Sequence, residues 1–399
     1  MKKKNGFISM ALVYTFLIVF MFLMLAILRT YNEKDKFLEA INDQIDKDIS
    51  SDKLTSALIV NKLIEDNTPQ PMGVVSLTRI SNFSNANGNG LFYLSDKDLS
   101  DEDANGNTER LYFFRGTVDN NNLIYANMCF KILRTNEDGS IRMVYSGLPT
   151  SGKCKSMADG NPSIGNAAFA SSETINYVTM GSNEVYDDSI PHSPIIDLLN
   201  NWYLNKIIVA SSDGGSYISP TAIYCSNRDL NANINNYKYY AARALMPTYI
   251  DAENRNPYDS TSVSNTVSLK CTNIADRYSL ANKNLSFPVG LLTATDVILA
   301  GGYLTDTDDE YQGGAIGTNL VNITNESYFL YTGSGYWTMS PYSTNTTNNE
   351  NAAVYVDTFG TLRGDHVTNT HAVIPVISLL PTTRIASGDG TENNPYILY

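Results

Sequence analysis

The sequence is constrained most by its first apolar run, residues 7–28, which contains no charged residue. About 20 apolar residues in a helix are long enough to cross the hydrocarbon core of a bilayer. Three lysines precede the run, and basic residues tend to stay on the cytoplasmic side of a membrane. We therefore predict a single-pass cell-membrane protein, with a transmembrane helix over 7–28, a cytoplasmic amino terminus and an extracellular remainder.

The leader before this run is short, and its last residue, Gly6, is followed directly by Phe7. This arrangement resembles the amino terminus of type IV prepilins and pseudopilins, in which a membrane peptidase cleaves after the glycine. The resemblance implies processing between Gly6 and Phe7 and pilin-like self-assembly. The family usually carries Glu at the fifth mature position, where this chain has Ala11, which puts assembly in doubt. A plain, uncleaved signal anchor is the alternative.

The helix is expected to continue past the membrane, because apolar residues recur at helical spacing and no Pro or Gly interrupts residues 7–49. Two prolines in a four-residue stretch then end the helical pattern. This gives a predicted division into five parts. They are a basic leader (1–6), a transmembrane helix (7–28), a helical stem (29–66), a linker (67–72) and a β-rich extracellular domain (73–399).

Short apolar and alternating segments after residue 73 are typical of β-strands, and residues 128–147 predict a β-hairpin. Two short helices are also expected. One begins at Ser193 and Pro194, because Ser is a common cap and Pro suits the first helical position. The other begins at Thr293 and Asp296, whose spacing matches a capping box. The predicted class is α+β, with a long amino-terminal helix followed by a β-rich head.

Several segments of the head resemble bacterial surface modules whose closing strands look like the C-type-lectin-like fold shared with sulfatase-modifying enzymes. They are 112–116, 129–132, 139–142, 271–273, 336–341, 371–377 and 388–396. The resemblance implies a lectin-like head that displays binding loops. Relatives usually have Arg before the closing Pro, where this chain has Ile374. The catalytic Cys pair of the enzymes is missing, since no Cys follows Cys271.

The four cysteines indicate two disulfides, because an even number on the exported side of a membrane is typical of oxidised pairs. Four cysteines allow three connectivities. The nearest-neighbour one joins Cys129 to Cys154 and Cys225 to Cys271. Four buried thiols are the alternative. No CxxC spacing is present, so a zinc site is not favoured.

A calcium loop is one interpretation of a polar segment whose oxygen-bearing residues alternate around Gly106. The candidate ligands are Asp101, Asp103, Asn105, Asn107 and Glu109. The twelfth position, which is a bidentate Glu in such loops, is Tyr112. A polar turn between strands is the alternative. Calcium is the cofactor that the sequence suggests.

Other constellations give little support for catalysis. His366 and His371 flank a turn next to Asp365, and a metal pair or a general base there competes with an ordinary polar hairpin. Tyr336, Trp337 and the cluster Tyr237, Tyr239 and Tyr240 are candidates for stacking on sugars or peptides, although such aromatics are more often core or sheet residues. No nucleophile-elbow sequence is present. We therefore do not expect an enzyme.

The formal net charge is −13, and such a surface repels nucleic-acid phosphates. The sequence therefore predicts a membrane-anchored, pilin-like surface protein that presents an extracellular recognition or adhesion domain. Its expected partners are the lipid bilayer, other copies of itself and an extracellular glycan or protein ligand. An exported cell-envelope enzyme and a structural pseudopilin of a secretion or uptake machine are the alternatives.

Overall fold

The computed structural model describes residues 57–72, 89–94, 111–172, 193–228, 230–234, 237–240, 242, 269, 271, 274–302, 328–347 and 350–399. The chain divides into two compact units, Met1–Ala57 and Leu58–Tyr399, and the described helices and strands belong to the second. The predicted leader, the apolar run and the stem up to residue 56 lie outside the described residues.

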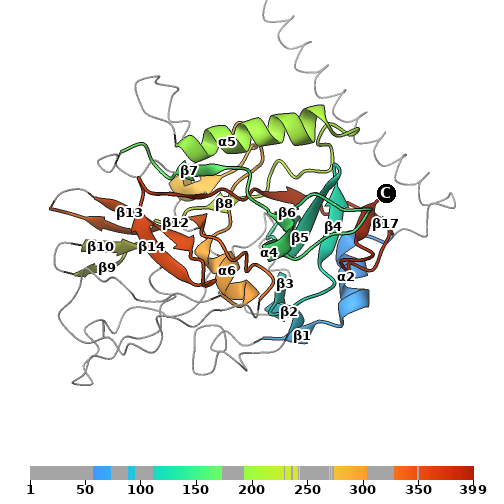
Figure 1. The fold of residues 1–399 in the computed structure, drawn as a ribbon. Coiled ribbons are helices and arrows are strands. Elements are labelled where there is room, and N and C mark those ends of the chain that lie inside the picture. Colours follow the sequence, from blue (N-terminus) through green and yellow to red (C-terminus); the bar gives the residue numbers. More distant parts are fainter. Residues whose placement is uncertain are drawn as a thin grey trace, which may run out of the picture. The chain divides into compact units, whose positions relative to one another are not determined.

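The predicted fold class is wrong for the chain that the structure describes. This part is mostly β-sheet, and its helices are short. The α-helices are α2 (Ile59–Asn67), α4 (Met157–Gly160), α5 (Pro194–Tyr203) and α6 (Ala294–Ala300). None of the described helices has the length and apolar character needed to cross a membrane. Strand pairing between distant segments, and not a long helix, organises these residues (Figure 1).

The larger sheet has nine strands among the described residues. Its main path is β1 (Gln70–Pro71), β2 (Gly90–Leu94), β3 (Leu111–Arg115), β5 (Met128–Thr135), β4 (Asn122–Tyr125), β18 (Tyr396–Leu398) and β17 (Ile385–Ser387), with β6 (Ile141–Gly147) on β5 and β16 (Val376–Leu379) on β6. The predicted hairpin over 128–147 is confirmed as β5 and β6. Every residue of these two strands is buried, because both faces of the sheet are covered there.

The second sheet has seven strands among the described residues. Its path is β14 (Leu362–His366), β13 (Asn351–Val356), β12 (Tyr336–Asn345), β10 (Tyr237–Tyr240) and β9 (Leu230–Ile234), with β15 (Thr370–Ala372) beside β12 and β7 (Asn166–Ala168) beside β15. A separate pair joins β8 (Tyr224–Cys225) to β11 (Arg277–Tyr278). The segment 67–72, predicted as a linker, lies within this unit, since β1 pairs with β2.

Helix α5 begins where the sequence predicts, with Ser193 at the cap and Pro194 at the first helical position. The Ser193 side chain does not cap the helix, because its hydroxyl donates to the carbonyl oxygen of Phe169 at 2.7 Å. The helix buries one apolar face, which includes Ile195 and Trp202. It continues as a π-helical segment, Leu204–Val209, and a 3₁₀ turn, Ile274–Asp276, occurs farther along the chain.

Helix α6 contacts both sheets, touching β3 in one and β12 in the other. The predicted capping box is confirmed: the Thr293 hydroxyl accepts from the Asp296 backbone, and Asp296 accepts from the Thr293 backbone. The Asp296 carboxylate also pairs with Arg134 of β5 at 2.7 Å and with Arg142 of β6 at 3.4 Å. Arg115 of β3 donates to the Ile298 carbonyl at the other end of α6. The helix is therefore bound to the larger sheet through charged groups at both ends.

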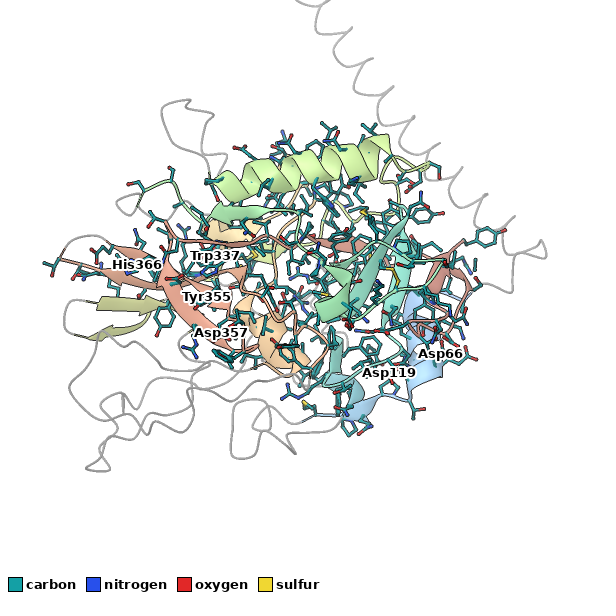
Figure 2. All side chains as sticks on the ribbon, in the orientation of Figure 1. Asp66, Asp119, Trp337, Tyr355, Asp357 and His366 are labelled. Atoms are coloured by element: carbon teal, nitrogen blue, oxygen red, sulfur yellow. A yellow bond between two sulfur atoms is a disulfide. The ribbon has the colours of Figure 1, made fainter. Side chains whose placement is uncertain are left out.

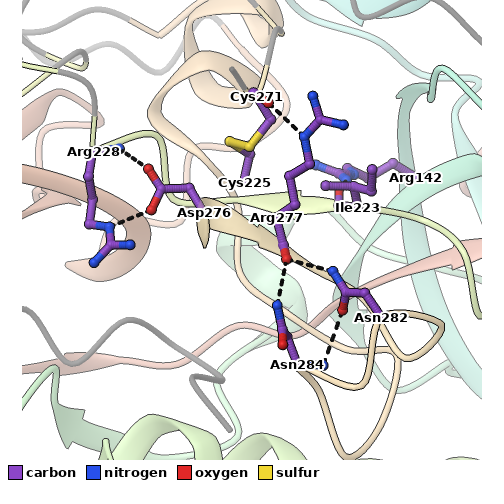
Figure 3. The surroundings of a disulfide bond; sticks show 9 residues. All are labelled: Arg142, Ile223, Cys225, Arg228, Cys271, Asp276, Arg277, Asn282 and Asn284. Atoms are coloured by element: carbon purple, nitrogen blue, oxygen red, sulfur yellow. Dashed lines mark hydrogen bonds and ion pairs between the residues drawn. A yellow bond between two sulfur atoms is a disulfide. The ribbon is translucent and has the colours of Figure 1, made fainter. Parts of the chain in front are cut away.

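Two disulfides join the four cysteines in the nearest-neighbour connectivity, Cys129–Cys154 and Cys225–Cys271. The expectation of two disulfides is thus confirmed, and no cysteine is free. Cys225 ends strand β8, whose partner β11 begins only six residues after Cys271, at Arg277. The Arg277 side chain donates to the Cys271 carbonyl at 2.7 Å (Figure 3). Sheet pairing therefore brings the two ends of this long loop together.

Candidate functional site

The predicted processing and calcium sites cannot be placed, because their residues lie outside the described part of the chain. This holds for Gly6 and Phe7, and for the calcium-loop candidates Asp101, Asp103, Asn105, Asn107 and Glu109. Within the described residues, no group of three or more His, Cys, Asp and Glu side chains is arranged to hold a metal ion. The two sites therefore stay predictions.

Three rings meet in the second sheet, where β15 pairs with β12. Trp337 of β12 and Tyr355 of β13 are directly opposite each other in the strand pairing. His371 of β15 stacks on Tyr355 with the ring centroids 4.1 Å apart and the planes 15° from parallel. Trp337 meets the same imidazole edge-on at 4.6 Å. Figure 2 labels Trp337 and Tyr355 on these strands. The imidazole is therefore held against two aromatic rings.

A carboxylate fixes the orientation of this imidazole. Asp365 Oδ2 lies 2.7 Å from Nε2 of His371. Asp365 Oδ1 accepts from the Asn369 side chain at 2.7 Å and from the His366 backbone at 2.9 Å. Burial opposes ionisation of Asp365, but these hydrogen bonds outweigh it and hold the pKa of its carboxyl below the usual range.

A second charged pair lies on the same face of the sheet. Arg363 is directly opposite Tyr355 on β14, so the two side chains project from one face. Its Nε lies 2.6 Å from Asp357 Oδ2. Asp357 Oδ1 in turn accepts from the backbone N–H groups of Phe359 and Thr361, each at 2.9 Å. The turn between β13 and β14 therefore fixes the ion pair.

We call Tyr355, Asp357, Arg363, Asp365 and His371 the Tyr355 face. Its side chains are held in place. Asp357 is buried, whereas 23% of Asp365, 20% of Arg363 and 18% of His371 is exposed. Burial raises the pKa of the Tyr355 phenol, and the nearby Asp365 and Asp357 carboxylates add to the shift. The phenol therefore stays protonated as a hydrogen-bond donor. The arrangement offers an aromatic ring beside fixed donors and acceptors, which suits binding of a polar ligand.

Proton transfer fits this geometry less well than binding does. Nε2 of His371 is already paired with Asp365, and Nδ1 faces Gly335, where an added Cβ would lie 3.1 Å from it. A general base needs a ring nitrogen within reach of the proton that it removes. The local contacts thus favour an orienting or binding role for the imidazole.

Sequence reasoning found part of this face and missed the rest. It singled out His366 and His371 beside Asp365; the structure joins the His371 ring to that carboxylate by a hydrogen bond, whereas His366 donates to it through its backbone. Tyr336 and Trp337, two of the aromatics it chose for stacking on a ligand, are 0% and 1% exposed and belong to the core, and the others lie on β10. Sequence reasoning missed Tyr355, although the alternation of side chains between the two faces of a strand could have identified it.

Asp357 and Arg363 were also missed. Both are two residues from another member of the face, Asp357 from Tyr355 and Arg363 from Asp365, and side chains at that spacing share one face of a strand. The geometry is thus that of a largely buried polar and aromatic sheet face in a disulfide-containing β-rich unit. No protein-family model, no curated protein and no solved structure matches this chain.

Proposed function

We propose that the chain is an exported cell-surface recognition protein that binds an extracellular ligand at the Tyr355 face. The observation that supports the proposal is the fixed geometry of this face, where His371 and Arg363 are each held by a carboxylate beside a partly buried tyrosine. Side chains that are ordered before binding lose little conformational entropy when a ligand arrives.

A glycan suits the face best. Sugars present many hydroxyls, which pair with fixed carboxylate, guanidinium and imidazole groups, and apolar C–H faces, which pack on an aromatic ring. A protein ligand is the other class that a recognition domain of this kind would bind, and the experiment below separates the two.

Export is supported by the two disulfides, which persist in oxidising compartments and are rare in the cytosol. The basic leader and the charge-free apolar run at 7–28 support retention at the cell membrane, with the amino terminus inside and the described domain outside. The Gly6–Phe7 junction extends the proposal to cleavage of the leader and pilin-like self-assembly.

The proposal is tested by applying the full-length protein, in detergent, to glycan arrays and to arrays of extracellular proteins. The wild type is expected to retain a glycan. The Tyr355→Ala variant removes the aromatic anchor, and it should bind roughly tenfold more weakly or worse. Tyr112→Ala is the matched control, because Tyr112 is also a half-buried strand tyrosine but lies on β3 of the other sheet.

The control variant should bind as the wild type does, and thermal melts should show that both variants are folded. Silence of the wild type on both arrays would contradict recognition. Equal weakening of binding in Tyr112→Ala and Tyr355→Ala would show that the ligand does not bind at the Tyr355 face. A signal confined to the protein array would replace the glycan with a protein ligand.

A further inference from the structure

A buried lysine lies on β5, far from the Tyr355 face. Only 2% of the Lys131 side chain is exposed, and its Nζ lies 3.3 Å from Oε1 of Glu392, which is 43% exposed. Burial lowers the pKa of the Lys131 amine, although Glu392 and Asp119 act in the opposite direction. A larger share of this amine is therefore neutral, and hence nucleophilic, than for a lysine in water.

An asparagine stands directly opposite this lysine. Asn122 of β4 is the strand partner of Lys131. The next pair along the ladder is hydrogen-bonded, since the Ile132 backbone donates to the Asn121 carbonyl at 2.7 Å. Pairs alternate in an antiparallel ladder, so Asn122 and Lys131 form a non-hydrogen-bonded pair. In such pairs the Cα atoms are about 4.5 Å apart and the side chains are closest.

The amide of Asn122 is held by its nitrogen. Nδ2 donates to the carbonyl oxygens of Asp119 at 3.0 Å and Gly390 at 2.9 Å. Its oxygen, Oδ1, is buried and accepts no hydrogen bond from any described residue. Burying an acceptor without a partner is unfavourable. The amide group is thus fixed in place while its carbonyl stays unsatisfied.

A loop near the carboxyl end places Glu392 beside this pair. The Asn122 backbone donates to the Gly390 carbonyl at 2.8 Å, and the Cys154 backbone donates to the Glu392 carbonyl at 2.9 Å. Gly390 has φ +80° and approaches so closely that an added Cβ would lie 2.3 Å from the Asn120 carbonyl oxygen. An amine, an amide and a carboxylate are therefore gathered from β5, β4 and this loop.

We propose that Lys131 and Asn122 condense into an intramolecular amide cross-link, with Glu392 as the proton carrier. Nζ of Lys131 attacks Cγ of Asn122, a Cγ–Nζ bond forms, and the Cγ–Nδ2 bond breaks. One proton passes from Nζ through Glu392 to the departing nitrogen. The neutral amine and amide thus give one new amide and one ammonia.

Two physical effects make this reaction reasonable without an added reagent. Strand pairing places Lys131 directly opposite Asn122, so the two groups need no encounter in solution, and effective molarities for well-oriented intramolecular reactions reach about 10⁵–10⁸ M. A carboxylate within reach of the moving proton supplies general acid–base catalysis. An ion pair between the buried Lys131 and the exposed Glu392, with no covalent bond, is the competing account.

The cross-link has a definite signature in a tryptic digest of the reduced and alkylated full-length protein. Asn122 and Lys131 belong to one peptide, because Arg115, Lys131 and Arg134 are consecutive cleavage sites. A modified Lys131 resists trypsin. The expected product is the peptide 116–134, uncut after Lys131 and lighter than its sequence mass by one ammonia.

The variant Glu392→Gln keeps the shape of the side chain but cannot carry the proton, and it should give the ordinary peptide 116–131 at its sequence mass. Glu350→Gln, at the residue before β13 of the second sheet, is the matched control and should keep the cross-link. Recovery of 116–131 at full mass from the wild type would overturn the proposal. Complete cross-linking in Glu392→Gln would overturn the role of Glu392.

Discussion

At the residue scale, the charged groups inside the β-rich unit matter most, because a buried charge is tolerated only with partners. Asp296 is 2% exposed and lies between Arg134 and Arg142. Burial works against its ionisation, but the two guanidinium groups and the Arg134 and Thr293 hydrogen bonds hold its pKa far below the usual range. One carboxylate thus links α6 to β5 and β6.

Replacing this carboxylate by an amide should be strongly destabilising. Asp296→Asn leaves two buried arginines without their counter-charge, and breaking a buried pair in this way typically costs about 3–5 kcal/mol. The free energy of unfolding at neutral pH, from urea denaturation, measures the loss. Asp197→Asn on the exposed side of α5 is the control. A loss no larger than the control's would contradict the network's role.

The same carboxylate predicts a pH dependence. Its pKa is depressed in the folded state relative to about 3.9 in the unfolded chain, so its stabilisation is present above that value. The stabilisation is lost as the pH falls below about 4 toward the folded pKa. Asp365, whose pKa is also lowered, adds to the loss. Urea midpoints measured between neutral pH and about pH 3 should fall less in Asp296→Asn than in the wild type, and equal slopes would contradict the assignment.

Pairings of this kind were beyond sequence reasoning. Arg134 and Asp296 are 162 residues apart, and their contact depends on how α6 is placed on β5, which no local pattern encodes. The Tyr355 face was found only in part for a related reason. Tyr355 and His371 lie on strands that are not neighbours in the sheet. Their rings meet because β12 pairs with both β13 and β15.

At the element scale, the sequence predicted helices and turns well where a few neighbouring residues determine the local structure. The capping box at Thr293 and Asp296 begins α6, and Gly301, in the left-handed conformation, ends it. The hairpin over 128–147 follows from two apolar segments around a turn at Gly139, which has φ +76°. The order of strands in the sheets was not predictable, since β4 pairs with β18 from the far end of the chain.

The cap of α6 gives a prediction at this scale. Thr293→Ala removes the side-chain oxygen that accepts from the Asp296 backbone at 3.0 Å and donates to its carboxylate at 2.9 Å. Loss of such a cap costs about 1 kcal/mol, and the urea midpoint should fall accordingly. Thr293→Ser retains the hydroxyl and should stay close to the wild type. Equal losses in the two variants would show that the methyl group, not the cap, matters.

At the scale of the whole molecule, the described residues form one β-rich unit with two covalent loops. The predicted α+β class gave too much weight to the first apolar run, which lies outside these residues. Export explains why the unit contains disulfides, and the cysteines were the sequence feature that gave the clearest indication of it. The sequence alone left their connectivity open. The pairing of β8 with β11 places Cys225 beside the segment that contains Cys271.

The two disulfides should contribute unequally. In the chain-entropy account, closing a loop of 25 residues stabilises by about 3.5 kcal/mol and a loop of 46 residues by about 4 kcal/mol. Urea denaturation of the Cys129→Ser/Cys154→Ser and Cys225→Ser/Cys271→Ser variants compares them. Both variants should have a lower free energy of unfolding than the wild type, and the loss should be slightly larger for the Cys225→Ser/Cys271→Ser variant. A reductant that leaves the wild-type midpoint unchanged would contradict the stabilising role.

Recognition of an extracellular ligand requires that the unit Leu58–Tyr399 lie outside the cell. Protease treatment of intact producing cells, followed by detection of this unit with an antibody, tests that location most directly. We expect the unit to be degraded or released while a cytoplasmic marker stays intact. Protection of the unit until the cells are lysed would contradict the account.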